Sequence, residues 1–273
     1  MLLPLLLSLM AAHLQTSPAP DTTPVVIAWT RLSASTVRLR ASGSMRVDSA
    51  TPTIATHEHV LTLTASDCPP ARTTACPVQV GVVAARYGIG PDSATAIASM
   101  HDLGAGSTTR VLLAPNGAWE MASDSGATFA SGFVVEQLSD WMPLSLPARP
   151  VRVGDSWPVH LFSRRTTRRI GLLQEEFSGR ATLDSVGGAN RRYAWISVVG
   201  IDSGLAGASV GRNTVHSTIR WDLEEGAPDS AATVAEGPYD AAPNEFSPVR
   251  RRFYLRSRSS LQRVREPPEN AAP

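Results

Sequence analysis

The sequence contains no lysine; all 25 of its basic residues are arginine. A phosphate-binding loop of the usual kind uses a lysine to reach the phosphates, and kinase-type phosphoryl transfer also needs one. Schiff-base catalysis and pyridoxal phosphate chemistry need the ε-amine of lysine. The composition therefore excludes these classes of enzyme in their usual forms.

The chain also lacks an excess of charge of either sign. Its 25 basic and 24 acidic residues give a formal net charge of +1, so the whole molecule has no electrostatic bias toward nucleic acid or membranes. The 273 residues are 42% hydrophobic, which is typical of a globular domain with a substantial core. We expect no nucleic-acid partner.

Long apolar runs are missing except near the start of the sequence. The run from Leu2 to Ala12 has the length of a signal-peptide core and is too short to span a bilayer. We expect residues 1–20 to be a signal peptide, although positive charge is absent before the run, with cleavage after Ala12 or Ala19. No cysteine precedes Cys68 to hold a lipid anchor. The sequence predicts an exported protein, periplasmic or extracellular, without a transmembrane anchor.

Cysteine is scarce, with only Cys68 and Cys76 in the stretch CPPARTTAC. In an oxidising compartment this pair is expected to form a disulfide. The bridge closes a short loop and should contribute less than the roughly 3 kcal/mol expected for a fifteen-residue loop. A redox or metal pair is the alternative, but the spacing is not that of C-x-x-C and no nearby histidine completes a zinc site.

Apolar and polar side chains alternate along much of the sequence, most clearly in HSTIRWDLEE at 216–225. Strand side chains point to opposite faces in turn, so this pattern indicates strands that are buried on one side. Gly43 is expected to mark a bend or bulge, and residues 226–247 a loop around one short strand. The strands predicted from alternation span 36–48, 56–64, 78–87, 177–185, 191–201, 215–224 and 249–264.

Strong helical periodicity occurs over residues 128–142, where apolar residues recur at three- and four-residue spacing until Pro143 ends the pattern. A shorter helix is predicted to begin after Asp92, which is a suitable N-cap. The dipeptide Asn116-Gly117 lies between apolar runs and predicts a hairpin turn.

These patterns together predict a mainly β fold. Antiparallel strands with one wet face build a large curved sheet, half-barrel or barrel-like, packed on the amphipathic helix near 128–142. We assign residues 21–266 to a single β-rich domain, with two halves that meet near 143–150 as the alternative, and 267–273 to a disordered tail. Residues expected on the apolar face include Val37, Leu39, Ile219 and Trp221.

The tripeptide at 154–156, Gly-Asp-Ser, can hold a catalytic serine at Ser156. The GDSL esterase motif needs a downstream D-x-x-H pattern, and the trypsin-like motif continues with two glycines; here Trp157 follows, and the only later histidines are His160 and His216. A turn that leads into a strand is the simpler interpretation. We therefore predict no catalytic residues, because nothing in the sequence supports a triad.

Two histidines, His57 and His59, alternate along one strand and point to the same face, close enough to share a metal ion. A third ligand would have to come from elsewhere, such as His101 or Asp102. Because the sequence does not meet the ligand count, we predict neither a metal site nor another cofactor.

The last predicted strand carries a row of arginines on one face, with Tyr254 among them. Guanidinium groups in a row can bind phosphates or carboxylates of an envelope polymer or a lipid headgroup. The alternative, which the near-zero net charge favours, is cross-strand pairing with acidic residues such as Asp222 and Glu224. The candidate anionic-ligand face consists of Arg250, Arg252, Arg256 and Arg258.

The segment LPARPVRVGDSWPV, followed by paired strands and WDLEEG, resembles uncharacterised exported bacterial β-rich families, domains of unknown function that carry the phrase P-x-x-P-V-x-x-G-D-x-W. The likeness covers about residues 146–264. It implies export and a β-rich fold, and it implies no activity and no catalytic residues.

The sequence favours a non-enzymatic binding or carrier module, in which a curved sheet shelters an apolar ligand or lipid. A structural or interaction protein of the cell envelope, with a packed core and a protein partner, is the alternative. A serine hydrolase is the least favoured alternative. The analogy with carriers lies at the level of the fold only.

Overall fold

The structure is a computed structural model that describes residues 23–29, 36–49, 51–65, 75–103, 105–121, 138, 140–167, 171–206, 209–243 and 249–265. Its strands are β1 (Val37–Asp48), β2 (Thr53–Ala65), β3 (Cys76–Gly90), β4 (His101–Asp102), β5 (Thr108–Leu113), β6 (Trp119–Met121), β7 (Ser156–Thr167), β8 (Gly171–Gly187), β9 (Tyr193–Ala206), β10 (Ser209–Asp222), β11 (Ala227–Ala241) and β12 (Arg251–Arg263). The helices are α1 (Ser93–Ala98) and the short 3-10 helix η1 (Ala189–Arg191).

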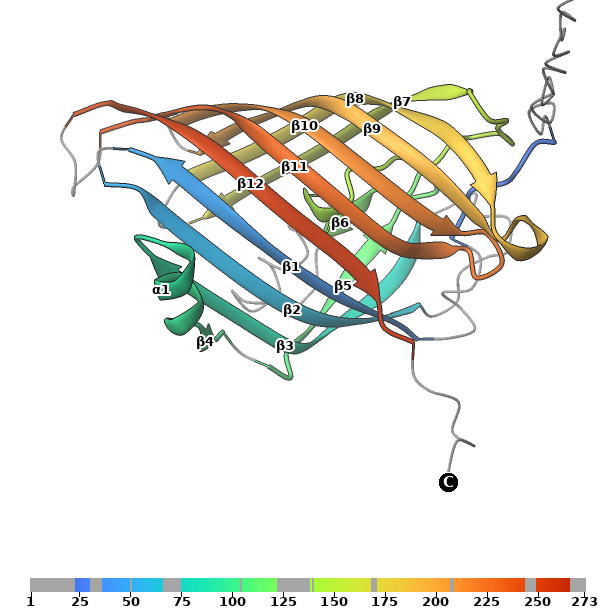
Figure 1. Cartoon of the computed structure of the whole chain (residues 1–273), viewed down its shortest axis with the longest axis horizontal. Helices are drawn as coiled ribbons and strands as arrows, with labels where there is room; N and C mark the ends of the chain where they lie inside the picture. The colour runs from blue at the N-terminus through green and yellow to red at the C-terminus, as the bar shows by residue number, and fades with distance from the viewer. Residues whose placement is uncertain are drawn as a thin grey trace, which may run out of the picture.

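All twelve strands belong to one antiparallel sheet that curves strongly but is not closed (Figure 1). The strand order is β6-β5-β3-β2-β1-β12-β11-β10-β9-β8-β7, and β4 pairs with β3 beside this path. Neighbours in sequence are neighbours in the sheet from β1 to β3 and from β7 to β12, whereas β5 pairs with β3, β12 returns to pair with β1, and β6 and β7 form the two edges. The structure thus confirms the mainly β fold with a large curved antiparallel sheet.

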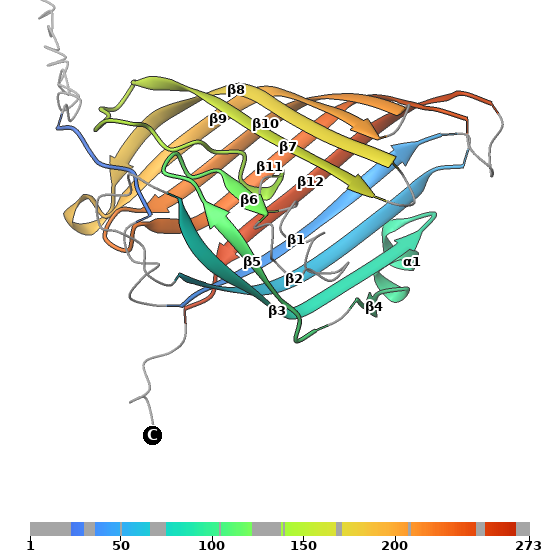
Figure 2. The same cartoon turned by 180° about the vertical axis from the view of Figure 1, so that it is seen from behind.

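Figure 2 shows the sheet from behind. Its two faces differ in exposure as the alternation predicted. On β10 the side chains of His216, Thr218 and Arg220 are exposed on the convex face. The side chains between them point into the concave face and belong to the core. The four residues predicted for that face are 0 to 3% exposed: Val37, Leu39, Ile219 and Trp221.

The short helix α1 packs on the outer side of β3, as its predicted N-cap suggested. The carboxylate of Asp92 accepts a hydrogen bond of 2.8 Å from the backbone N–H of Thr95. Side chains at Gly88 and Gly90 would collide with the backbone of Ala96, so both glycines permit the close approach.

Most of the longer helix predicted over 128–142 lies outside the described residues. At its end, Leu138 and Trp141 are helical, and the N–H of Met142 donates to the carbonyl of Leu138 at 3.2 Å. All three of these side chains are buried, whereas that of Asp140 is exposed. The apolar side of this last turn therefore faces the core, as its periodicity indicated.

Two local predictions need correction. Gly43 pairs with His57 on β2 and Ser259 on β12 without a shift in register, so it is not a bulge. A side chain there would place Cβ 2.7 Å from Cε1 of His57, so the glycine makes room for an imidazole. Residues 227–241 form the 15-residue strand β11, where one short strand within a loop was expected; small residues such as Ala231 suit a crowded concave face although they weaken the hydrophobic alternation.

Aromatic packing fills one end of the concave face. The indole of Trp29 lies edge-on to those of Trp119 and Trp221, with ring centroids 5.6 and 5.0 Å apart. The N–H of Leu146 donates to the carbonyl of Asn116 at 2.5 Å, in the hairpin turn between β5 and β6 that the sequence predicted. This hydrogen bond attaches the segment that precedes β7 to the hairpin of β5 and β6.

Several predictions concern residues that the structure does not describe. The predicted signal peptide, the tail at 267–273 and Cys68 all lie outside the described residues. Cys76 is buried at the first position of β3, and its disulfide with Cys68 stays a prediction. No helix among the described residues is long and apolar enough to span a membrane.

Candidate functional site

The concave face is sealed at one end and accessible at the other. Along β1, Leu39 is 1% exposed, whereas Met45, three inward positions further on, is 40% exposed. On β3 the inward side chain of Ile89, paired with Ala55 of β2, is 51% exposed. We name the accessible part the open end; its inward-facing residues include the apolar or aromatic Met45, Ile89, Phe177, Tyr239, Phe253 and Leu255 and the polar Glu175, Asp202 and Asn213.

Strand register brings the open-end residues together from distant parts of the sequence. Asp202 on β9 is paired directly with Phe177 on β8 and with Asn213 on β10. One step nearer the rim, Tyr239 on β11 is paired with Phe253 on β12. Residues of a pair point to the same face of an antiparallel sheet, so these side chains form one concave surface.

Glycines shape this surface by letting aromatic rings lie against the backbone. A Cβ at Gly200 would lie 2.5 Å from the Cζ atom of Phe177, and one at Gly211 would lie 3.0 Å from the ring of Tyr239. A Cβ at Gly204, further along the same face of β9, would meet no atom within 4 Å. The rings therefore lie on either side of Asp202, beside unfilled space at Gly204.

A carboxyl and an amide are the polar groups between these rings. The amide nitrogen of Asn213 donates to Oδ2 of Asp202 over a long 3.5 Å. Burial raises the pKa of the Asp202 carboxyl above its usual value, and the hydrogen bond from Asn213 partly offsets this rise. The Oδ1 atom of Asn213 is buried and has no hydrogen-bond partner within the described part of the chain.

The two candidate metal ligands lie deeper, between the open end and the sealed end. The rings of His57 and His59 stack near Trp141 with centroids 5.3 to 5.9 Å from one another, and the indole N–H of Trp141 donates to Nε2 of His57 at 3.3 Å. Burial lowers the pKa of each histidine to about 4, with His57 lowering that of His59 further and Glu58 raising it.

The suggested third ligands are not brought to this pair. His101 lies on β4, separated from His57 by Tyr87 of β3, and its ring contacts that tyrosine. Within the described ranges, no three His, Cys, Asp or Glu side chains are grouped so that they could hold a metal ion.

The predicted arginine row lies on the convex face of the sheet. Arg252 is 3.7 Å from Asp240, Arg256 is 3.9 Å from Asp48, and the Arg256 guanidinium also stacks on the ring of Tyr254. The acidic partners are thus carboxylates of β11 and β1. Asp222 and Glu224, the acidic partners suggested by the sequence, pair with Arg192 instead.

The structure does not bring Ser156 and a histidine together. The Ser156 hydroxyl lies 2.9 Å from that of Thr182, and Nδ1 of His160 lies 3.1 Å from the hydroxyl of Ser178. His216 is on the convex face of β10, next to Val199 and Val234. These residues are held in separate cross-strand contacts, without the mutual geometry of a nucleophile and its base.

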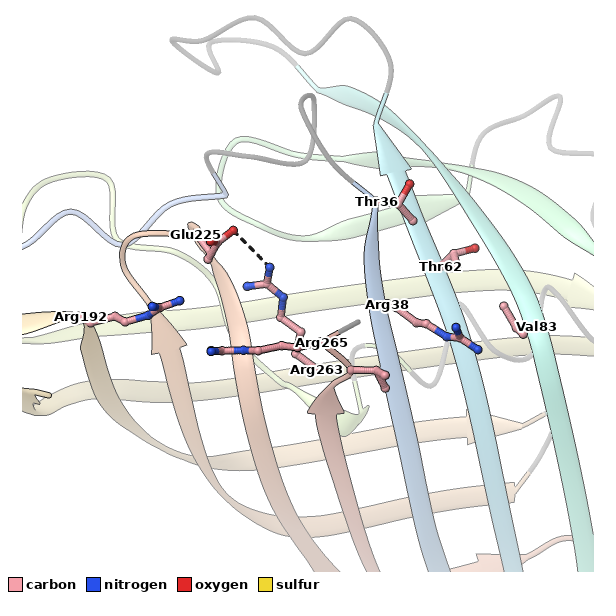
Figure 3. Close-up of a pocket in the computed structure, with 9 residues that line it drawn as sticks. Thr36, Arg38, Thr62, Val83, Arg192, Glu225, Arg263 and Arg265 are labelled. Atoms are coloured by element: carbon pink, nitrogen blue, oxygen red, sulfur yellow. Dashed lines mark hydrogen bonds and ion pairs between the residues drawn. The ribbon is translucent and has the colours of Figure 1, made fainter. Parts of the chain in front are cut away.

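Sequence analysis missed a pocket of about 490 Å³ at the sealed end, where β12 ends and β9 begins (Figure 3). Several arginines line the pocket, but carboxylates of the same protein pair with most of them. Arg263 pairs with Glu225 at 3.2 Å and Arg265 with the buried Asp229 at 2.7 Å. The buried carboxylate of Asp222 accepts two hydrogen bonds from Arg192. We interpret this cluster as a network that fastens the strand ends.

Comparisons with known proteins leave this chain without an assigned family. No family model matches the sequence, and no curated protein matches it. Among solved structures, it is similar to DynF from the dynemicin biosynthesis pathway of Micromonospora chersina, with 7% sequence identity, a TM-score of 0.25, and 93% of this chain and 92% of that chain covered. We draw no conclusion from a likeness of this size.

Proposed function

We propose that this protein is an exported, non-enzymatic binding module that shelters an apolar ligand or lipid against the open end of its concave face. The exposure of apolar side chains that point inward is the observation on which this proposal rests. Met45 and Ile89 are 40 and 51% exposed, although the same face of the sheet is sealed at its other end. A concave apolar surface with a few polar groups is typical of ligand sites.

Further support comes from the shape of this surface. Phe177 and Tyr239 lie against glycines, and the position above Gly204 is unfilled. Contiguous apolar surface that faces water is unfavourable and often marks an interaction site. Export and the absence of enzymatic activity are proposed from the sequence, through the apolar N-terminal run and the lack of a recognisable catalytic constellation.

Binding of diphenylhexatriene, an apolar dye that fluoresces when it is shielded from water, tests the proposal. We expect saturable binding to the purified protein, and co-purifying lipid in native mass spectra. Replacing Met45→Arg should weaken dye binding at least about tenfold by placing a charge in the site. Ser44→Arg, one residue away on the convex face, is the matched control and should leave binding unchanged.

Two outcomes would overturn the proposal. Absence of saturable dye binding by folded protein would favour the alternative of an envelope scaffold with a filled interior. Equal loss of binding in the Met45→Arg and Ser44→Arg proteins would show that the dye does not occupy the concave face.

A further inference from the structure

We propose, given the binding function above, that the apolar ligand carries a hydrogen-bond donor, a hydroxyl or an amine, which is received by Asp202 and Asn213 at the open end. Both residues point into the concave face from adjacent positions of β9 and β10. Their neighbours on this face are mostly apolar residues and glycines, with the exposed carboxylate of Glu175 on β8 opposite Gly204, so the site would hold the polar group of an otherwise apolar molecule.

The chemistry of the two side chains determines which kind of group they can receive. An ionised carboxylate only accepts hydrogen bonds, so the amide of Asn213 must turn its nitrogen toward Asp202, as observed at 3.5 Å. This orientation leaves Oδ1 of Asn213 as a buried acceptor without a partner among the described residues. The carboxylate has acceptor capacity left as well, because a single long bond does not saturate it. Both side chains can therefore accept a further hydrogen bond, and a donor group on the ligand would supply it.

The free-energy cost of unsatisfied polar atoms also favours a ligand donor at this pair. A buried polar atom that lacks a partner costs about 1–3 kcal/mol, and native structures contain few such atoms. Asp202 is also desolvated, which is unfavourable for a carboxylate that has only a long contact with Asn213. A ligand hydroxyl would donate its one hydrogen to either acceptor, and a ligand ammonium group, with three N–H donors, would satisfy both residues at once. The unfilled position above Gly204, two residues along the same face, provides room beside them.

Three ligands that share a decyl chain separate binding of the apolar chain of the ligand from binding of its polar end. We would measure displacement of diphenylhexatriene by 1-decanol, by decylamine and by 1-methoxydecane, which keeps the oxygen but has no donor. We expect the alcohol and the amine to displace the dye at about one-tenth of the ether concentration. Equal potency of all three would overturn the inference, while the proposed function would stand because dye and ether still bind.

Variants test whether Asp202 and Asn213 cause the preference for ligands with a donor. The double replacement Asp202→Leu with Asn213→Leu should abolish the preference for alcohol and amine over ether, and retain dye binding. Asparagine has nearly the shape of aspartate but no charge, so the single replacement Asp202→Asn should remove the advantage of the amine over the ether. This variant provides the test if the double variant does not fold. Asp184→Asn, the same change at an exposed carboxylate that accepts from Ser197 on the convex face, is the control. Persistence of the amine's advantage in Asp202→Asn, or of either preference in the double variant, would contradict the assignment.

Discussion

Two glycines on the concave face of β9 show how individual residues shape this sheet. A Cβ at Gly200 would lie 2.5 Å from the ring of Phe177 and 2.6 Å from the carbonyl oxygen of Ser178, whereas one at Gly204 would meet nothing within 4 Å. Only the first glycine is required by close packing. The second lies at the open end, where the concave face is not filled.

We predict opposite tolerance to alanine at these two positions. Gly200→Ala should lower the free energy of unfolding by about 1–3 kcal/mol, because backbone or ring must shift to admit the methyl group. Gly204→Ala should change it by less than about 1 kcal/mol, or raise it slightly through lower entropy of the unfolded chain. Urea denaturation of both variants provides the measurement. Equal destabilisation would show that the face at Gly204 is as crowded as at Gly200.

The half-buried His57 and the buried His59 make the stability of the fold sensitive to acid. Their pKa values of about 4 lie below the ordinary 6.5, so the unfolded chain takes up protons that the folded chain does not. Their stabilising contribution is present above pH 6.5 and is lost as the pH falls toward 4.

We therefore predict that the free energy of unfolding falls between pH 6.5 and 4, by on the order of 3 kcal/mol for each imidazole. His59→Leu should remove about half of this pH dependence, because it leaves His57 in place. His216→Gln, on the exposed convex face of β10, should retain the full dependence. Denaturation midpoints measured across this range would contradict the account if His59→Leu behaved like the control.

At the scale of elements, ion pairs fasten strand ends that the sequence does not bring together. Asp222 ends β10 and is 0% exposed; it accepts hydrogen bonds from Arg192 before β9 and from Arg265 after β12. The backbone N–H groups of Glu224 and Glu225 donate to its other oxygen at 3.1 Å. Burial alone would raise the pKa of this carboxyl, but these bonds and charges lower it overall.

Removal of this carboxylate should loosen three strand ends at once. We predict that Asp222→Ala lowers the free energy of unfolding by about 3 kcal/mol. This value is at the low end of the cost of breaking a buried ion pair, because both arginines reach solvent. Glu224→Ala removes an exposed partner of Arg192 and should cost less than about 1 kcal/mol. Denaturant unfolding of both proteins checks the difference, and similar losses would mean that the network does not fasten the strands.

The sequence predicted the elements whose periodicity is strong and missed those whose periodicity is weak. Alternation placed β1, β10 and the buried faces of Leu39 and Ile219 correctly, because a half-buried strand must separate apolar from polar side chains. It predicted only a short strand within a loop for β11, where alanine and glycine face inward and give little hydrophobic contrast. The pairing of Asp202 with Asn213 also could not be predicted, since it depends on strand order and register.

The whole molecule is a curved sheet with unlike ends. Tryptophans 29, 119 and 221 and the arginine network close one end, and a layer of His57, His59 and Trp141 lies across the middle. Beyond this layer the concave face becomes accessible, and its apolar residues surround the pair of Asp202 and Asn213. One end provides stability, and the other is available for a ligand.

Methyl NMR of the isotope-labelled protein during titration with 1-decanol tests this division most directly. The account predicts saturable shifts of the methyl groups of Met45, Ile89 and Leu255 at the open end, with those of Leu39 and Ile219 unchanged. Shifts confined to Val199 and Val234 on the convex face, or no saturable shift in the folded protein, would contradict it.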